Sequence, residues 1–305
     1  MVLLDLKYKN FKEKYLKFLK RKESKGKPIS YKVEKLNNFY LPLAEWIHKI
    51  YLKDRKIKII GLSGGQGVGK STITDILKFI LKKIYRLELC VFSIDDFYKT
   101  KTDRIKMSKN VHPLFLTRGV PGTHDTKLIS RTFKNLKKKK FKKFLIPKFD
   151  KSLDDRCKKS RWYKIKKAPN IVIFEGWCVG AIHQKESALK KPLNLIEKKY
   201  DINLKWRKKV NNELRKNYKR IFNDIDKLIF LKAPSFNNIF KWRFLQEQKL
   251  KLTSKNKKTM SKSEIKNFIM FYERITKKMM ADFSKISDLT IFLDEKHRSK
   301  RMKFF

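Results

Sequence analysis

A glycine-rich stretch at residues 61–72 constrains the fold of this chain more than any other feature. It reads Gly-Leu-Ser-Gly-Gly-Gln-Gly-Val-Gly-Lys-Ser-Thr, and residues 64–71 match the phosphate-binding loop (P-loop) pattern G-x-x-x-x-G-K-[ST]. Glycines let a backbone curl around a phosphate group and direct its N–H groups at the oxygens. A β-branched run at residues 57–60 precedes the loop, and apolar residues at helical spacing follow it. This strand–loop–helix order favours a nucleotide-binding loop over a chance glycine-rich turn.

The loop predicts which residues would hold the nucleotide. Lys70 would bring a positive charge to the β- and γ-phosphates, and the hydroxyl of Ser71 would bind Mg²⁺. The residues expected to bind the nucleotide are Gly64, Gly65, Gln66, Gly67, Val68, Gly69, Lys70, Ser71 and Thr72.

The second predicted strand, residues 87–93, ends in two adjacent carboxylates and a tyrosine. Residues that follow a strand's carboxyl end face the ligand crevice of an α/β sheet, so Asp95, Asp96 and Tyr98 are candidate site residues. Neighbouring residues of an extended strand point in opposite directions, so we expect only one carboxylate to reach the γ-phosphate. Asp95 would share a face with Ser93 and is the preferred candidate, although the choice between the two aspartates stays open.

Ionisable residues gather in two further loops and at one more strand end. The chain has only 10 glycines, and two of them lie in the loop at residues 118–125, which Pro121 makes more rigid and which carries Arg118, His124 and Asp125. A polar loop at residues 146–156 supplies Asp150 and Arg156. Arginine binds a carboxylate with two parallel hydrogen bonds, so Arg118 and Arg156 are suited to an acidic acceptor. The apolar strand at residues 171–174 ends at Glu175, as in strands that place an acidic group near Mg²⁺.

Strands and helices alternate along the chain, which predicts an α/β fold with a doubly wound, mostly parallel sheet and helices on both faces. The expected strands are residues 57–60, 87–93, 171–174, 228–231 and 289–293. We also expect a solvated helix over the lysine-rich residues 136–144. Residues 1–37 are interpreted as a basic, helical N-terminal arm. Residues 38–305 would form the P-loop domain, with a helical lid segment near residues 240–262.

Composition sets limits on partners and compartment. The chain has 79 Lys and Arg against 29 Asp and Glu, a net charge of +50. Nucleic-acid binding would explain this charge, but the lysines are dispersed rather than clustered, which favours compositional drift and no specific nucleic acid. Three distant cysteines and no visible secretory signal fit a reducing cytoplasm, and no apolar run is long enough to span a membrane.

Taken together, these motifs resemble those of the plant-type D-glycerate 3-kinases. That family belongs to the P-loop kinase group that also holds pantothenate kinase, uridine kinase and phosphoribulokinase. The resemblance runs over roughly residues 40–298 in matching order. The motifs that carry it are residues 64–71, 93–98 (Ser-Ile-Asp-Asp-Phe-Tyr), 118–125 (Arg-Gly-Val-Pro-Gly-Thr-His-Asp), 149–152 (Phe-Asp-Lys-Ser), 174–177 (Phe-Glu-Gly-Trp) and 241–243 (Lys-Trp-Arg).

The resemblance implies ATP and Mg²⁺ as cofactors, D-glycerate as phosphate acceptor, and 3-phosphoglycerate and ADP as products. By position, Asp95 looks like the base, Glu175 like the acidic residue near the metal, and Arg243 like a lid arginine that reaches the transferred phosphate. The expected acceptor-site residues are Asp96, Tyr98, Arg118, His124, Asp125, Asp150 and Arg156. Two alternatives stay open: a P-loop kinase for pantothenate, a nucleoside or a sugar phosphate, and a nucleotide-dependent switch or nucleic-acid-binding protein.

Overall fold

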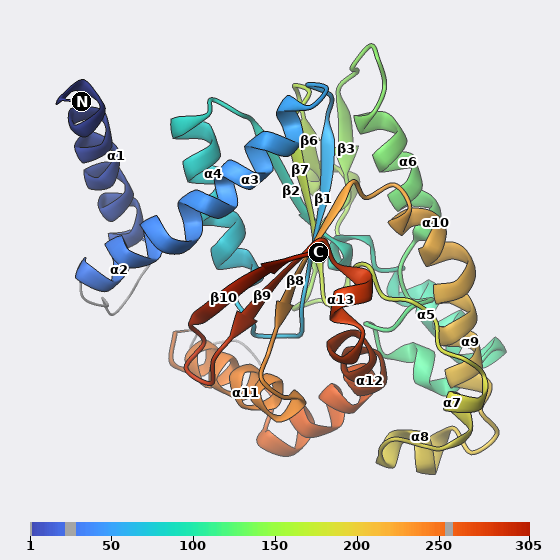
Figure 1. Ribbon diagram of the computed structural model, residues 1–305. Coiled ribbons are helices and arrows are strands. Elements are labelled where there is room, and N and C mark those ends of the chain that lie inside the picture. The colour runs from blue at the N-terminus through green and yellow to red at the C-terminus, as the bar shows by residue number, and fades with distance from the viewer. Residues whose placement is uncertain (1, 22–28, 254–258) are drawn as a thin grey trace. The chain divides into compact units, whose positions relative to one another are not determined.

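The computed structural model describes residues 2–21, 29–253 and 259–305 (Figure 1). The chain divides into two compact units, which are described separately. The first unit comes from residues 1–58, 71–90 and 169–171. The second unit comes from residues 59–70, 91–168 and 172–305.

The first unit is helical. Its helices are α1 (Val2–Lys20), α2 (Ile29–Lys35), α3 (Leu41–Leu52) and most of α4 (Lys70–Ile84). Three aromatic rings of α1 gather on Phe79 of α4, and the closest pair is Phe18–Phe79 with ring centroids 4.6 Å apart. An aromatic pair of this kind adds to the burial of apolar area. The predicted division of the chain at residue 37 stays a prediction, and residues 22–28 of that arm lie outside the described residues.

A six-stranded sheet organises the second unit, in the order β10-β9-β8-β1-β7-β2. Its strands are β1 (Lys58–Ser63), β2 (Leu89–Ser93), β7 (Ile171–Gly176), β8 (Lys227–Lys232), β9 (Leu289–Leu293) and β10 (Ser299–Phe304). Strands β1, β8 and β9 run parallel, and β10 pairs with β9 in the antiparallel direction. Figure 1 shows β8, β9 and β10 side by side.

This mostly parallel sheet with its helices confirms the α/β class, and all five strands predicted from sequence are present. Strand β10 was not expected, because four of its six residues are polar or charged and nothing in it reads as a buried run. A lysine-bearing strand is typical of a sheet edge, where charge discourages pairing with another chain.

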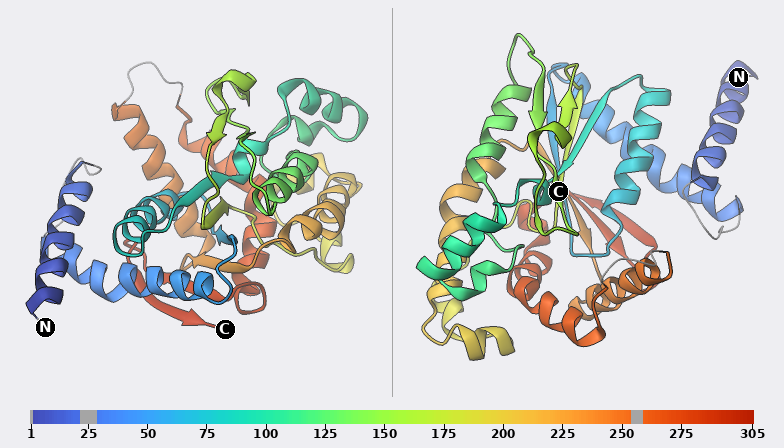
Figure 2. Two further views of the ribbon diagram at one scale, coloured as in Figure 1. Left: turned by 90° about the horizontal axis from the view of Figure 1, so that it is seen from above. Right: turned by 180° about the vertical axis from the view of Figure 1, so that it is seen from behind.

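The other elements of the second unit cover the sheet and form the loops of the site. The helices are α5 (Lys101–Asn110), α6 (Thr126–Leu136), α7 (Ser187–Lys190), α8 (Leu195–Tyr200), α9 (Lys205–Glu213), α10 (Lys219–Phe222), α11 (Phe236–Thr253), α12 (Lys262–Ala281) and α13 (Phe283–Ile286). Two short antiparallel pairs join β3 (Phe144–Ile146) to β6 (Tyr163–Ile165) and β4 (Phe149–Asp150) to β5 (Asp155–Arg156). Helices α11 and α12 pack on each other and appear as neighbouring orange helices in Figure 2. Within the described residues, no helix has the length and apolar character needed to cross a membrane.

The helix predicted over residues 136–144 is wrong. Helix α6 begins at its N-cap Asp125, whose carboxylate accepts the Leu128 N–H, and it ends at Leu136. The lysines that follow would stack like charges one helical turn apart, which destabilises a helix. The chain instead runs through a loop into β3.

Candidate active site

The P-loop has a backbone that only glycine tolerates. Gly64, Gly67 and Gly69 have φ angles of 154°, 77° and 91°. A Cβ atom on Gly64 would lie 2.9 Å from the carbonyl oxygen of Leu231, and one on Gly67 would lie 3.1 Å from the backbone of Trp242. The loop therefore fits closely between the end of β8 and α11. At Gly64 and Gly67 its curl leaves little room for a Cβ atom, and it suits a phosphate cradle made of backbone amides.

Lys70 closes the inside of this loop. Its Nζ atom donates hydrogen bonds to the carbonyl oxygens of Gly64 (2.7 Å) and Gly65 (3.0 Å). Burial lowers the pKa of Lys70, while the carboxylates of Glu175 and Asp95 act in the opposite direction. The lysine therefore already lies in the field of two of the acidic residues singled out in the sequence. Ser71 and Thr72, at the start of α4 in the first unit, have exposed side chains.

The segment after β2 is a short 3₁₀ turn, Ile94–Phe97, rather than a continuation of the strand. Ser93 caps it: the Asp95 N–H donates to the Ser93 hydroxyl, and the Ser93 N–H donates to the Asp96 carboxylate. This reciprocal cap fixes both aspartates. The premise that strand alternation decides which aspartate faces the site is therefore wrong, because the backbone is not extended there.

Both carboxylate oxygens of Asp95 have partners. Oδ1 accepts the Tyr98 hydroxyl at 2.9 Å, and Oδ2 accepts Nζ of Lys151 at 2.8 Å. Burial raises the pKa of Asp95, but the Lys151 ammonium, with His124 and the Tyr98 hydroxyl, lowers it to about 2. Asp95 is therefore a stably charged carboxylate in this arrangement.

Asp96 has the opposite electrostatic environment. Burial, together with the neighbouring Asp95 charge, raises its pKa to about 6 despite N–H donors from Ser93 and Phe149. Of the two carboxylates, Asp96 therefore has the higher pKa. Its Oδ2 atom accepts the N–H of Ser93 in the cap at the end of β2.

The loop at residues 118–125 is held rigidly against the segment that carries Asp95. The Lys99 N–H donates to Thr123, the Asp125 N–H donates to Phe97, and the His124 ring stacks on Tyr98 with centroids 4.5 Å apart. Two aromatic side chains hold its first residues from the other side. Tyr272 of α12 donates its hydroxyl to the Arg118 carbonyl, and the Trp177 indole donates to that of Gly119.

The 149–156 hairpin, formed by β4, β5 and the turn between them, organises the cations of the site. Its Asp154 forms ion pairs with Arg118 and with Arg104, and Arg104 is almost fully buried. The Arg118 guanidinium also lies over the Phe149 ring, 5.5 Å from its centroid. Asp154 therefore fixes Arg118, whose charge acts on Lys151, and Lys151 in turn donates to the Asp95 carboxylate.

Three predicted acceptor-site residues are engaged in local structure. Asp125 is the N-cap of α6, and Asp150 accepts the N–H groups of Ser152 and Leu153 in the hairpin turn. Arg156 donates to the Tyr98 carbonyl at 2.7 Å and to Asp125 at 3.4 Å. These contacts position Tyr98 and the hairpin.

His124 differs from these residues because one of its nitrogens is unsatisfied. The ring is almost completely buried, and burial lowers its pKa to about 3, so it is neutral at physiological pH. Nδ1 contacts the Tyr218 hydroxyl at 2.5 Å, whereas Nε2 has no hydrogen-bond partner among the described residues. A buried group of this kind is available to a bound ligand.

Glu175 and Arg243 lie where the sequence predicts, at a strand end and on the helix beside the P-loop. Glu175 is the next-to-last residue of β7, and its charge acts on Lys70. Arg243, in the first turns of α11, forms an ion pair of 2.6 Å with Glu247 one turn further along. Residues 254–258 of the predicted lid segment lie outside the described residues.

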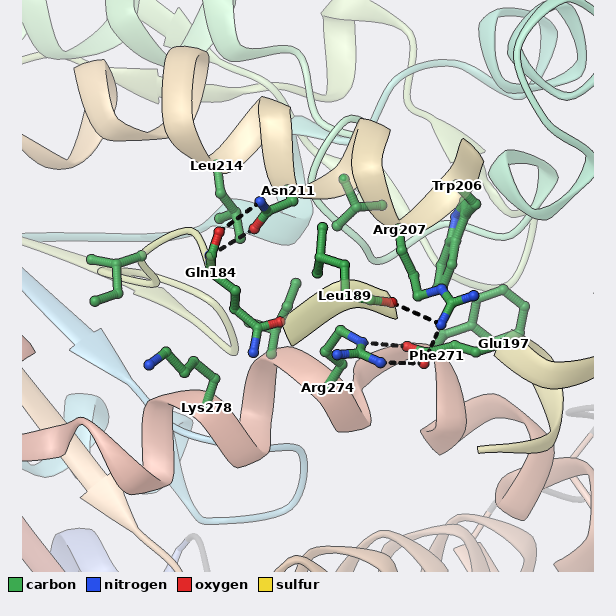
Figure 3. Close-up of a pocket in the computed structure, with 13 residues that line it drawn as sticks. Gln184, Leu189, Glu197, Trp206, Arg207, Asn211, Leu214, Phe271, Arg274 and Lys278 are labelled. Carbon is green, nitrogen blue, oxygen red and sulfur yellow. Dashed lines mark hydrogen bonds and ion pairs between the residues drawn. The ribbon is translucent and has the colours of Figure 1, made fainter. Parts of the chain in front are cut away.

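A separate cavity lies among α7, α9 and α12 (Figure 3) and contains none of the predicted site residues. Its charged side chains already have partners: Arg274 and Arg207 contact Glu197, Arg207 also contacts Asp201 at 2.7 Å, and Lys278 contacts Asp282. Buried charged side chains are stable only when each has a partner of opposite charge. We interpret the cluster as structural.

Comparison with known proteins agrees with the fold. The sequence profile of the phosphoribulokinase/uridine kinase family matches residues 59–246, more than half of the chain. The chain belongs to this family. The family assignment makes the protein a P-loop kinase, a nucleotide-binding phosphotransferase that uses ATP.

Two curated relatives and one solved structure are similar to this kinase. The uncharacterized kinase mug58 of Schizosaccharomyces pombe is 34% identical over 70% of this chain and 78% of its own length. The chloroplastic D-glycerate 3-kinase of Arabidopsis thaliana is 28% identical over 78% of this chain, and the match spans about half (53%) of the plant protein. A D-glycerate 3-kinase from Cryptococcus neoformans has the same fold, with a TM-score of 0.74, 23% identity, and coverage of 87% of this chain and 99% of that one.

The sequence did not identify three residues that shape the site: Lys151, Tyr218 and Tyr272. Lys151 stands inside a quoted motif, yet one lysine among so many gives no signal of its own. Tyr218 and Tyr272 come from helical segments distant in sequence, and their roles depend on a tertiary contact with the 118–125 loop. Only the folded chain reveals such contacts.

Proposed function

We propose that the protein transfers the γ-phosphoryl group of ATP to the 3-hydroxyl of D-glycerate. The observation that carries the proposal is the set of cations around the candidate base. Lys151 contacts Asp95, Arg118 is fixed by Asp154 beside Phe149, and the two cations are close enough for their charges to interact. A small carboxylate is the acceptor that such an arrangement favours.

The packing of the aromatic side chains near the predicted acceptor loops favours the same choice. The rings that line the predicted acceptor loops, Tyr98, His124 and Phe149, are packed on one another. Because these rings pack on one another, they offer no open aromatic face to a ligand. A nucleoside base would need such a face for stacking. Two similar proteins are described as D-glycerate 3-kinases, which agrees with this reasoning.

In the proposed mechanism, the P-loop amides and Lys70 hold the triphosphate while Asp95 orients the acceptor hydroxyl. The hydroxyl oxygen forms a bond to the γ-phosphorus, the bond from that phosphorus to the β–γ bridging oxygen breaks, and the electron pair leaves with ADP. The hydroxyl proton passes to the Asp95 carboxylate. Arg243, on α11 beside the P-loop, would neutralise charge on the transferred group.

Mg²⁺ fits this donor set. The ion is held in kinases by one or two carboxylates together with phosphate oxygens and waters. Glu175, at the end of β7, would supply such a carboxylate. The ion would supply charge neutralisation at the phosphates.

The decisive experiment measures ADP release with a panel of acceptors: D-glycerate, L-glycerate, pantothenate, uridine and ribulose 5-phosphate. We expect D-glycerate alone to drive turnover, with 3-phosphoglycerate as product. A faster rate with another acceptor would replace the substrate while leaving the kinase assignment intact. Lys70→Ala is the matched control and should abolish ADP release with every acceptor.

A further inference from the structure

Lys151 stands apart from the other cations of the site because most of its side chain is exposed. It lies in the turn of the 149–156 hairpin, and its side chain is 64% exposed, while that of its partner Asp95 is 25% exposed. Arg104 donates to the carbonyl oxygens of Leu116 and Asp154, and Arg156 donates to the Tyr98 carbonyl. These arginines are fixed, whereas a flexible, exposed lysine exchanges partners easily.

The contact made by Lys151 weakens the candidate base. Its Nζ atom donates to Oδ2 of Asp95, and the Tyr98 hydroxyl donates to Oδ1. Each oxygen can accept a further hydrogen bond, but the ammonium beside Oδ2 stabilises the negative charge of the carboxylate. Asp95 therefore becomes a stronger base when the ammonium moves away from Oδ2.

We propose that Lys151 locks Asp95 until an anionic acceptor arrives, and that it then transfers to the acceptor's carboxylate and frees the base. This inference rests on the proposed function, since it assumes an acidic acceptor. The turn holds the backbone of Lys151 close by, because Asp150 accepts the N–H groups of Ser152 and Leu153. Only the side chain has to move.

The lock gives the enzyme a way to distinguish its acceptor from water. A carboxylate competes with Asp95 for the ammonium because both carry a negative charge, and the fixed Arg118 nearby adds a second cation for the same carboxylate. Water carries no charge and cannot draw Lys151 away. Lys151 is thus a specificity-determining residue that couples acceptor binding to activation of the base.

The test compares Lys151→Met with Lys151→Arg, and uses Lys148→Met as a control lysine just before the same hairpin. Two quantities are measured with ATP: the ratio of kcat/KM for D-glycerate to that for glycerol, its uncharged analogue, and ATP hydrolysis without acceptor. For Lys151→Met we expect the ratio to fall by about 10- to 100-fold, the range of a hydrogen bond to a charged group, and hydrolysis to increase. Lys151→Arg should recover most of the ratio, and Lys148→Met should resemble the wild type.

The two measurements separate this proposal from the proposed function. If the wild type uses D-glycerate but Lys151→Met changes neither the ratio nor the hydrolysis, the lock is overturned and the substrate stands. If the wild type ignores D-glycerate while Lys151→Met hydrolyses ATP faster, the substrate is wrong and the lock is supported. A circular dichroism melt of each variant shows whether the exposed substitution has altered folding.

Discussion

The hydroxyl of Tyr218 lies 2.5 Å from Nδ1 of His124, and this contact determines which imidazole nitrogen carries the proton. The same hydroxyl oxygen accepts the N–H of Gly122, which favours donation of its single proton to Nδ1. With Nδ1 as the acceptor, the neutral ring carries its own proton on Nε2, the nitrogen that has no partner among the described residues. Tyr218, from a helical segment remote in sequence, thus turns His124 into a buried donor beside Tyr98 and Asp95.

Tyr218→Phe tests this role. The substitution removes the partner of His124 Nδ1 and of the Gly122 N–H, and each unsatisfied buried group costs about 1–3 kcal/mol. We expect a lower melting temperature and, because the imidazole tautomer is no longer fixed, an increase in KM for the acceptor with little change in KM for ATP. Tyr163→Phe, at an exposed tyrosine, is the control. An unchanged acceptor KM would show that the His124 donor does not contact the acceptor.

Asp95→Asn and Asp96→Asn identify the base. Asp95 faces Lys151 and Tyr98, and its loss should lower kcat by about 10²–10⁴, the usual contribution of a general base. Asp96 serves the Ser93 cap, and asparagine retains an oxygen that can accept the same N–H, so we expect a much smaller loss. Steady-state kinetics with saturating ATP measure both. A large loss only in Asp96→Asn would transfer the role of base to Asp96, whose higher pKa suits proton transfer near neutral pH.

The raised pKa of Asp96 also makes a prediction about stability. Burial raises this pKa from 3.8 to about 6 in the folded protein, so the folded state binds the proton more tightly than the unfolded state. The contribution of Asp96 to stability is therefore fully present below about pH 4 and is lost as the pH rises to about 6. The free energy of unfolding falls by at most about 3 kcal/mol over this range.

Asp96→Asn stays neutral at every pH and should escape this loss. Its free energy of unfolding relative to wild type should rise between pH 4 and pH 7, as measured by urea denaturation at a series of pH values. Because the other titrating groups are common to both proteins, the difference isolates Asp96. A difference that is flat across this range would contradict the raised pKa.

The net charge of +50 predicts how the protein behaves with DNA. If the charge reflects compositional drift, binding should be weak, independent of sequence, and should weaken steeply as salt rises from 50 to 200 mM. Fluorescence anisotropy with two unrelated duplexes at several salt concentrations measures this. Tight, sequence-selective binding at physiological salt would instead favour the nucleic-acid alternative.

The sequence was sufficient for features that depend on local pattern. The P-loop, its flanking strand and helix, and the five strands follow from spacing and β-branched runs, which local sequence encodes. The sequence could not show that residues 94–97 turn into a capped 3₁₀ segment, because Ser93 and Asp96 form that cap in preference to an extended strand. It also could not show that Arg156 and Asp125 pair with each other. Isolated arginines and aspartates look equally suited to a ligand until their neighbours in space are known.

Arg118→Lys is the sharpest test of the acceptor's chemistry. Arg118 is positioned by Asp154 and by the Phe149 ring, so its planar guanidinium is held in a fixed orientation. Lysine keeps the charge but replaces two parallel hydrogen bonds by a point contact, and it stacks less well on the ring. We expect KM for D-glycerate to rise by about 10-fold, the loss of one charge-assisted hydrogen bond, while KM for ATP stays nearly constant.

The control for Arg118→Lys is Arg161→Lys, at an arginine more than half exposed that pairs with Asp150 across 3.6 Å, and it should leave both constants unchanged. The two variants carry the same net charge as the wild type, so any difference between them reports geometry rather than electrostatic attraction of the anion. If Arg118→Lys raises KM for ATP instead, Arg118 binds the transferred phosphate. In that case the acceptor carboxylate would be bound by Lys151 and by the N–H donor of His124 instead.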